Sequence, residues 1–295
     1  MRVLVIGAAG QLGTDVVEVL TRHGDECVPA TREMVDISDR SAVEALFASE
    51  RPEAVVNCAA YHDVAGCEAN PELATAINTS AVSSLALACR KIGARFMTMS
   101  TDYVFDGTKL GGYTECDTPR PLNRYGESKL AGERQTLAAN PETFVVRTQS
   151  LFGLAGPSGK GLNFVELMIK LSEERDELKV DRCRMAPTGT AALAENMRSL
   201  LLTAHFGMYH MSCDGETSWY EFAKRILELT GSKTPVTPVP NDYFPRTFIR
   251  PENTYLINAG LRSRGLDQMP HWEQALTDYL RAKGHASLTG NAKSR

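Results

Sequence analysis

Short apolar runs alternate with amphipathic stretches throughout the first 150 residues. The apolar runs predict buried strands at residues 2–6, 26–30, 54–57, 95–100 and 143–148. Between them, apolar positions recur at helical spacing over residues 11–22, 42–47 and 71–92, and a further helix carries Tyr125. Because crossovers between parallel strands are right-handed, this alternation predicts an α/β fold built on a doubly wound parallel sheet.

The pattern loosens beyond residue 150. Glycines over residues 153–161 and five prolines over residues 234–253 predict loops, the second of them extended. Helical spacing returns at residues 163–174, 188–204, 218–229 and 271–283. We therefore expect a first domain over residues 1–150, a smaller C-terminal lobe over residues 151–283 with returns to the sheet, and a flexible tail over residues 284–295.

Composition narrows the classes of function. The chain of 295 residues is 43% hydrophobic and 23% charged, which is ordinary for a globular enzyme. Its net charge of -4 and pI near 5.9 argue against a nucleic-acid partner. No apolar run reaches the roughly 18 residues that a membrane span needs, and the N-terminal run is too short for a signal peptide. Seven scattered cysteines without Cys-x-x-Cys spacing favour a reducing, cytoplasmic setting and predict no metal site or disulfide framework.

Three glycines follow the first predicted strand directly. Gly7, Gly10 and Gly13 recur at every third position, where the next helix begins. In a dinucleotide site such glycines allow a tight turn, a close approach of the pyrophosphate and close helix–strand packing. The helix N-terminus, at Gln11 and Leu12, then faces the phosphate charge. A purely structural turn is the alternative, but this position after an N-terminal strand favours a Rossmann-type NAD(P)-binding domain.

The end of the second predicted strand bears on which nicotinamide cofactor binds. NAD-preferring sites usually place an acidic residue there for the adenosine ribose, whereas this chain has Thr31 and Arg32. Arg32 can meet a 2′-phosphate, which favours NADPH over NADH, although a surface arginine also fits the pattern and NADH stays possible. The other expected cofactor contacts are Asp36, Ile37, Cys58, Ala59 and Ala60.

A tyrosine and a lysine lie one helical turn apart, at Tyr125 and Lys129, and emerge on the same helix face. A nearby ammonium favours phenolate and lowers a tyrosine pKa that starts at about 10. Such a phenol can exchange a proton with a carbonyl oxygen, and Thr101, at a strand's carboxyl end, can donate to the same oxygen. Alone, the pair also fits a solvated helix face. With the glycine turn, the three residues predict hydride-transfer chemistry.

Longer runs of the sequence resemble a known family. The runs are Ser100-Thr-Asp-Tyr-Val-Phe-Asp-Gly107, Pro121-Leu-Asn-Arg-Tyr-Gly-Glu-Ser-Lys-Leu-Ala-Gly-Glu133, Gly161-Leu-Asn-Phe164 and Pro187-Thr188. They look like the extended short-chain dehydrogenase/reductases and, within them, the dTDP-4-dehydrorhamnose reductase group. The resemblance implies NAD(P)H-dependent reduction of the C4 ketone of dTDP-6-deoxy-L-lyxo-4-hexulose to dTDP-L-rhamnose. It also implies a C-terminal substrate-binding lobe, and Lys129 as a ligand of the nicotinamide ribose.

The chain departs from the group near the expected sugar. The group usually ends its fifth strand with Arg-Thr-Ser-Trp, whereas Ser150 stands here at the position of the tryptophan. His62 replaces a common threonine, and Ala65 an aspartate. Losing the tryptophan removes a large apolar wall, which leaves the identity of the sugar open. Some members bind Mg²⁺ through acidic residues; Asp15 can stand for one, but Ala191 occupies another, so we predict no metal.

Substrate contacts are expected at seven positions. Arg182, Arg184 and Arg250 fall in segments that the resemblance assigns to the lobe, and Arg250 is favoured to hold a diphosphate, with surface salt bridges as the alternative. His62 is expected either to read a substrate hydroxyl or to form a hydrogen-bonded wall. The expected substrate contacts are His62, Val64, Asp102, Tyr103, Ser150, Asn163 and Arg250.

Two other functions stay open on the sequence. Relatives of this fold serve as NADP-binding regulatory subunits, for example of methionine adenosyltransferase, and others are nucleotide-sugar epimerases. The intact Thr101, Tyr125 and Lys129 set favours the reductase. We expect a nucleotide sugar as the partner molecule and a monomer or homodimer as the assembly.

Overall fold

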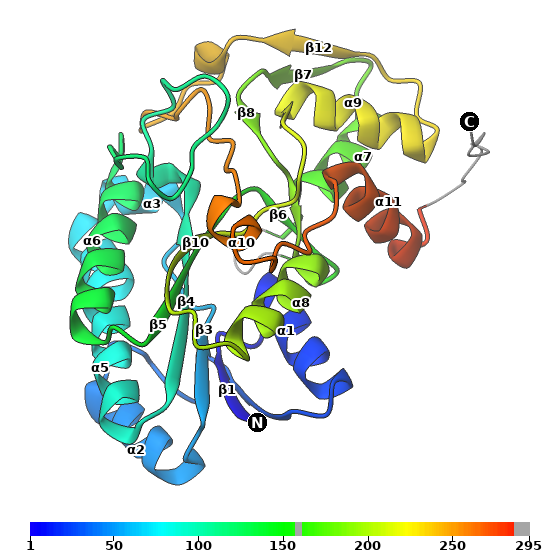
Figure 1. Ribbon diagram of the computed structural model, residues 1–295. Helices are drawn as coiled ribbons and strands as arrows, with labels where there is room; N and C mark the ends of the chain where they lie inside the picture. The colour runs from blue at the N-terminus through cyan, green and yellow to red at the C-terminus, as the bar shows by residue number, and fades with distance from the viewer. Residues whose placement is uncertain (157–160, 286–295) are drawn as a thin grey trace.

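A six-stranded parallel sheet forms the centre of the molecule (Figure 1), in a computed structural model that describes residues 1–156 and 161–285. Its strands are, in spatial order, β10 (Gly207–His210), β5 (Thr143–Thr148), β4 (Arg95–Thr101), β3 (Ala54–Asn57), β1 (Arg2–Ile6) and β2 (Glu26–Ala30). Every neighbouring pair is parallel. The predicted α/β fold is therefore confirmed, and β10 is a strand from beyond residue 150 that joins the sheet at its edge.

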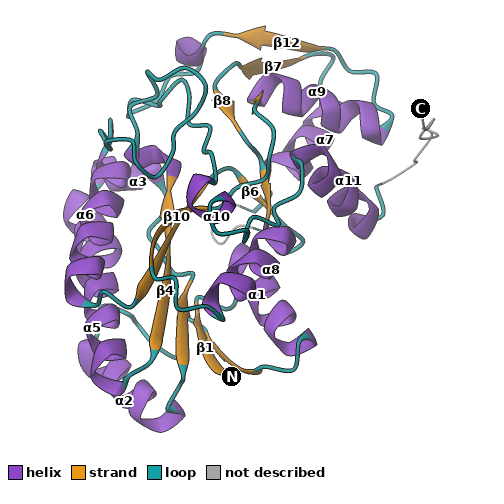
Figure 2. Cartoon of the chain, viewed as in Figure 1, coloured by secondary structure: helices purple, strands orange, loops and turns teal. Residues whose placement is uncertain are grey.

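Helices cover both faces of this sheet (Figure 2). One face carries α2 (Arg40–Glu50), α5 (Val82–Ile92) and α6 (Arg124–Ala139), and the other carries α1 (Gln11–Arg22) and α8 (Thr190–Leu201). Helix α2 is longer than the predicted residues 42–47, because Asp39 caps it by accepting from Ser41 N and Ala42 N. The predicted helix over residues 71–92 is helical throughout, but it contains a wide π turn, η1 (Ala76–Ala81), between α4 (Pro71–Thr75) and α5.

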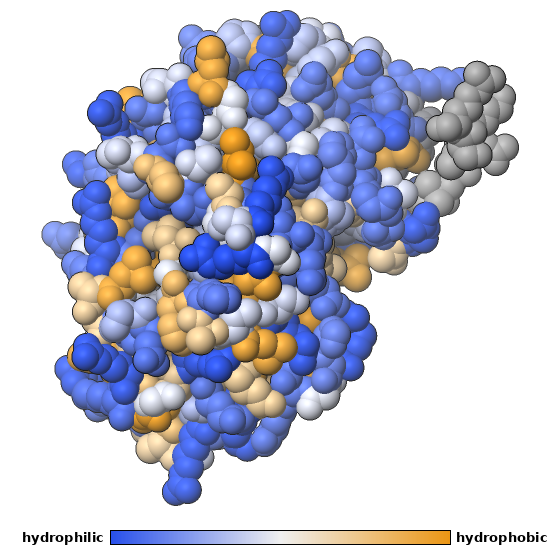
Figure 3. Space-filling view, in the orientation of Figure 1, coloured by the Kyte–Doolittle hydropathy of each residue, from blue (hydrophilic) through white to orange (hydrophobic). Residues whose placement is uncertain are grey.

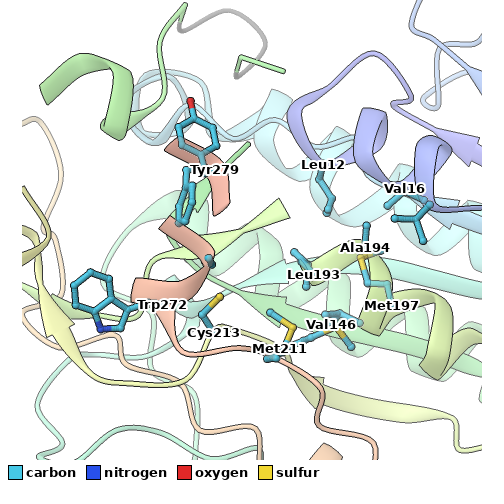
Figure 4. Packing of buried hydrophobic residues seen from close by; sticks show 14 of the residues in the cluster. Leu12, Val16, Val146, Leu193, Ala194, Met197, Met211, Cys213, Trp272 and Tyr279 are labelled. Atoms are coloured by element: carbon cyan, nitrogen blue, oxygen red, sulfur yellow. The ribbon is translucent and has the colours of Figure 1, made fainter. Parts of the chain in front are cut away.

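The main hydrophobic core joins the sheet to the C-terminal helices. Figure 4 shows Leu12 and Val16 of α1 packing near Leu193 and Met197 of α8, with Val146 of β5 in the same cluster. The cluster continues through Met211 and Cys213 to α11 (Trp272–Lys283). The C-terminal part of the chain is thus fixed to the sheet by burial of apolar area, the dominant stabilising term in folding.

Short strand pairs and helices build the C-terminal lobe. The pairs are β7 (Leu178–Asp181) with β12 (Val236–Val239), β8 (Arg184–Met185) with β11 (Thr217–Ser218), and β6 (Leu151–Phe152) with β9 (Thr188–Gly189). The helices of the lobe are α7 (Phe164–Glu174), α9 (Trp219–Thr230), α10 (Ala259–Arg262), α11 and the short η3 (Asn241–Tyr243). Two further short helices, α3 (Val64–Ala69) and η2 (Asp102–Val104), lie in the first part of the chain.

The lobe corrects one prediction. Residues 234–253 are not extended loop throughout, since β12 and η3 lie within them. Prolines are tolerated here because β12 pairs with a single neighbour, so its backbone needs few donors. The predicted loop over residues 153–161 and the predicted tail lie partly outside the described residues, which omit 157–160 and 286–295.

The visible surface is mostly hydrophilic, with small apolar patches scattered between polar side chains (Figure 3). Among the described residues, the helices are all too short or too polar to cross a membrane.

Candidate active site

The glycine turn after β1 has the backbone that a dinucleotide cradle needs. Gly7 adopts φ +79, and a Cβ there would lie 2.8 Å from Ala59 N. At Gly13 a Cβ would lie 2.1 Å from Gly7 O, so helix α1 packs against the turn more closely than any larger residue allows. Gly10 is the N-cap of α1 and offers no side-chain cap, which leaves the amides of the first turn to a ligand.

Polar groups around the cradle fit a phosphorylated dinucleotide. The Gln11 Oε1 atom is buried without a hydrogen-bond partner. A buried acceptor of this kind calls for a donor, which a bound nucleotide can supply. Arg32 is exposed just after β2, where a 2′-phosphate would be held, and Thr31 beside it is half-buried. The residues present therefore fit NADP.

Hydrogen bonds within the chain fix the two segments that follow β2 and β3 beside the glycine turn. Asp36 accepts from Ser38 N over 2.9 Å and from Ser38 Oγ over 2.7 Å, beside the buried Ile37. After β3, Asn57 donates to Ala59 O over 3.3 Å and accepts from Ala59 N over 3.1 Å, which fixes the turn at the cradle.

The remaining two residues of the β3 turn are Cys58 and Ala60, both half-buried. Burial raises the pKa of the Cys58 thiol to about 12, so this cysteine is a wall and not a nucleophile.

Thr101 closes β4 at the same edge of the sheet. Its Oγ1 accepts from Tyr103 N over 3.1 Å, which starts the short helix η2, and donates to Asp102 Oδ1 over 2.9 Å. Burial raises the pKa of the Asp102 carboxyl to about 6, opposed by hydrogen bonds from Thr254 and Thr101 and by the charge of Arg250. The Thr101 hydroxyl, the Asp102 carboxyl and the Tyr103 backbone amide thus form one hydrogen-bonded group.

Helix α6 brings Tyr125 to this group. Its N-cap Asn123 accepts from Gly126 N over 2.9 Å and donates to Ile249 O over 3.0 Å. A Cβ at Gly126 would lie 2.2 Å from Tyr103 O, so this glycine allows the helix to approach η2. The Tyr103 and Tyr125 rings meet edge to face at 5.8 Å, and the Thr101 hydroxyl forms a hydrogen bond with the Tyr125 phenol. Tyr125 and Thr101 therefore lie together.

The charge state of Tyr125 differs from our expectation. We expected Lys129 to lower the phenol's pKa, but desolvation raises the pKa of Tyr125, and Asp102 also raises it. Lys129 is buried, and its ammonium donates to Met99 O over 2.7 Å. Burial also lowers the pKa of Lys129 to about 8. For both groups, loss of hydration is thus the largest effect on the pKa.

A buried ion pair stands behind Lys129. Glu133 lies one turn further along α6 and raises the pKa of Lys129 against the effect of burial. Its carboxylate accepts from Arg147 Nε over 2.8 Å and from Nη2 over 2.6 Å, and from Ser100 Oγ over 2.5 Å. The Arg147 guanidinium also lies 3.3 Å from His210 Nε2. This bidentate pair and its neighbours therefore join β4, β5, β10 and α6 to one another beneath the site.

Two arginines converge on one carboxylate beside η2. Arg250 Nη1 donates to Asp181 Oδ2 over 2.8 Å, and Arg246 Nη2 donates to the same oxygen over 3.2 Å. The Arg250 guanidinium also lies 5.2 Å from the Trp219 ring centroid. Since Asp181 balances only one of the two charges, the group has a net positive charge next to Asp102.

The structure places the other predicted substrate contacts further from the group around Thr101. His62 and Val64 are half-buried around the start of α3, and Ser150 adopts φ +48 just after β5. Arg182 is exposed, and Arg184 pairs with Glu216 near the surface.

Asn163 uses its amide within the protein. It caps α7 by accepting from Glu166 N over 3.1 Å, and it donates to Gly153 O over 3.1 Å and to Tyr279 Oη over 2.9 Å. These partners bind α7 to α11, and they do not include the group around Thr101.

No cluster of three or more metal-ligating side chains occurs among residues 1–156 and 161–285. Asp15, the acidic residue singled out by the sequence, is buried beside Thr190, and desolvation raises the pKa of its carboxyl.

Sequence reasoning missed Asp181, Arg246, Thr254 and Glu133. Glu133 had a usable signal, because its spacing of four from Lys129 places it on the same helix face. The other three lie in short strands or irregular segments, where no periodicity reveals which side chains meet.

Known proteins match this chain over nearly its whole length. A family model described as RmlD substrate binding domain matches residues 1–284. The chain is 38% identical to dTDP-4-dehydrorhamnose reductase of Streptomyces griseus, over 94% of this chain and 92% of the relative. It is 37% identical to dTDP-4-keto-6-deoxy-D-glucose reductase of Streptomyces niveus, over 94% and 95% of the two chains.

A solved structure agrees with these relatives. The structure of dTDP-4-dehydrorhamnose reductase from Bacillus anthracis in complex with NADP matches with a TM-score of 0.90 at 36% identity, and the match covers 95% of this chain and 99% of that one. The resemblance seen in the motifs is thereby confirmed, and this chain belongs to the RmlD substrate binding domain family, together with the dTDP-4-dehydrorhamnose reductases.

Proposed function

We propose that this protein is an NADPH-dependent reductase of the 4-keto group of a dTDP-linked deoxy sugar. One observation carries the proposal: Thr101, Tyr125 and Lys129 gather at the carboxyl edge of the parallel sheet, the edge that holds the glycine turn. Ligands of open α/β sheets bind at this edge. Membership of the family and the names of the relatives support the same reaction.

The residues have distinct roles in this proposal. NADPH bound against Gly7 and Gly13 would supply hydride to the carbonyl carbon. Tyr125 gives its proton to the carbonyl oxygen, and Thr101 orients and polarises that oxygen. Lys129 is the ligand of the nicotinamide ribose in this proposal. Arg32 holds the 2′-phosphate, which favours NADPH while NADH remains usable.

The substrate side of the proposal rests on charge and space. Arg250, half-buried beside Asp102, holds the diphosphate, and Arg246 adds a second guanidinium within reach of the same group. His62, Val64, Tyr103 and Ser150 surround the sugar in this proposal.

The sugar itself has two candidates. The relatives with nearly equal identity are named for two different 4-keto sugars, dTDP-4-dehydrorhamnose and dTDP-4-keto-6-deoxy-D-glucose. The space beside Ser150 decides between these two sugars, because a serine leaves room where the group has a tryptophan.

The same proposal assigns the parts of the chain and its setting. Residues 1–150 hold the nucleotide cofactor, and residues 151–283 mainly hold the nucleotide sugar. The enzyme works in the cytoplasm, as a monomer or a homodimer, and its partner molecule is the nucleotide sugar.

Assays of NADPH and NADH oxidation with dTDP-, UDP- and GDP-linked 4-keto sugars test this function. We expect turnover with dTDP sugars and a preference for NADPH. Tyr125→Phe should lower kcat by about two to four orders of magnitude, the usual contribution of a general acid, while NADPH affinity stays within about twofold. Near-normal turnover of Tyr125→Phe would refute the assignment.

The two alternative functions give different results in the same assays. A regulatory subunit binds NADP without turning over any sugar and co-purifies with a partner enzyme. An epimerase keeps its cofactor through purification and consumes none during turnover.

A further inference from the structure

The Thr101 hydroxyl has one proton, and Asp102 accepts it in this structure. Thr101 Oγ1 donates to Asp102 Oδ1 over 2.9 Å and accepts from Tyr103 N over 3.1 Å. A hydroxyl has one proton to donate and two acceptor positions, and Tyr103 N occupies one of those acceptor positions. While Asp102 is ionised, Thr101 therefore has no proton for a substrate oxygen.

Protonation of Asp102 reverses the direction of the hydrogen bond between Asp102 and Thr101. A protonated carboxyl can donate to Thr101 Oγ1, whereas a carboxylate can only accept. Tyr103 N still occupies one acceptor position, so Thr101 then accepts from Asp102 and its own proton becomes free. The protons of Thr101 and Tyr125 can now point at one external oxygen.

We propose that Asp102 is a positioning residue whose protonated form turns the Thr101 hydrogen bond outward, so that Thr101 and Tyr125 donate to the same carbonyl oxygen. The inference rests on the proposed keto reduction and adds a proton-controlled step to it. No covalent bond to carbon changes at Asp102. Its proton stays on the carboxyl during the reaction, while Tyr125 transfers its own proton to the substrate oxygen and is reprotonated from solvent.

The surroundings of Asp102 allow this protonation. The residue is 4% exposed, and burial raises its carboxyl pKa to about 6. The groups that face it are Arg250 and Thr254, which lower the pKa, and the phenols of Tyr103 and Tyr125. A bound sugar would exclude more water and raise the pKa further. Because the protonated form is the active one, the rate should fall as pH rises through this pKa.

Single-turnover oxidation of NADPH with a saturating dTDP-4-keto sugar, followed over pH, tests the proposal. In the wild-type enzyme we expect the rate to fall at least about tenfold above the pKa of Asp102, as for the loss of one oxyanion donor. In Asp102→Asn the side-chain amide can donate to Thr101 at every pH, so this fall should disappear. Lys129, with a pKa of about 8, can produce a second fall, which Asp102→Asn should keep.

Thr254→Val is the matched second variant. Its hydroxyl lowers the pKa of Asp102 from outside the Thr101 hydrogen bond, so its removal should move the fall to higher pH. The proposal is overturned if Asp102→Asn keeps the wild-type fall, or if Thr254→Val leaves its position unchanged.

A spectroscopic titration makes the test independent of turnover. The wild-type enzyme with bound NADP⁺ should show an infrared carbonyl band of a protonated carboxyl that titrates with pH and is missing from Asp102→Asn. If no 4-keto sugar is reduced but this band titrates, the proposed function fails while the switch at Asp102 survives. If sugars are reduced and the band does not exist, the switch fails and the reductase stands.

Discussion

Glutamine at position 133 should destabilise the protein strongly and change the titration of Lys129. Glu133 and Arg147 have side chains that are 3% and 4% exposed, and they are joined by two charge-assisted hydrogen bonds of 2.8 and 2.6 Å. Glu133→Gln keeps the shape of the side chain but leaves the guanidinium buried without its counter-ion. Breaking a buried pair from one side costs about 3–5 kcal/mol, against a total stability of about 5–15 kcal/mol.

The same substitution should act on catalysis through Lys129. The Glu133 carboxylate raises the pKa of Lys129, which burial has lowered to about 8. Without that carboxylate the pKa falls further, so the ammonium is lost at a lower pH. We therefore expect the high-pH fall in kcat to move to lower pH in Glu133→Gln, while NADPH affinity measured below that fall stays near wild type.

Urea unfolding, followed by tryptophan fluorescence, measures the change in stability. Two controls separate the buried pair from general effects. Glu127→Gln removes a half-exposed carboxylate on the same helix and should leave the midpoint unchanged. Replacing Glu133 and Arg147 together by methionine removes both charges and should lose less stability than Glu133→Gln. An unfolding free energy for Glu133→Gln within about 1 kcal/mol of wild type would refute the reasoning.

Three further predictions follow from the geometry. His210 is buried with a pKa of about 3, so the protein takes up a proton when it unfolds below about pH 6.5. The unfolding free energy should therefore fall toward pH 3 by up to about 1.4 kcal/mol per pH unit, and urea titrations of His210→Gln should show a shallower fall. Gly13→Ala would place a Cβ 2.1 Å from Gly7 O and should abolish NADPH binding measured by fluorescence, whereas Gly24→Ala, with open space at its Cβ but a φ of +78, should lose some stability and retain the binding. Arg32→Ser should weaken NADPH about tenfold and leave NADH unchanged, and equal loss of both would contradict the 2′-phosphate contact.

Local rules were enough to predict the scaffold of the site. The spacing of Gly7, Gly10 and Gly13 predicted the turn, because a left-handed φ and a close approach depend on the absence of a side chain at that residue. The four-residue step from Tyr125 to Lys129 placed both on one helix face, since the helical repeat is fixed by the backbone. The parallel sheet followed from alternating apolar runs in the same way.

The tertiary structure decided the electrostatics and the partners. The packing buries Tyr125, so the pKa of its phenol rises instead of falling, and it places Thr101 so that its hydroxyl donates to Asp102. It also brought Arg250 to Asp181, 69 positions earlier in the chain. Desolvation and charge pairing are sums over everything within a few ångströms, and those neighbours come from distant segments. The sequence therefore determined which groups stand on each element, whereas only the packing of the elements determined which protons and charges those groups share.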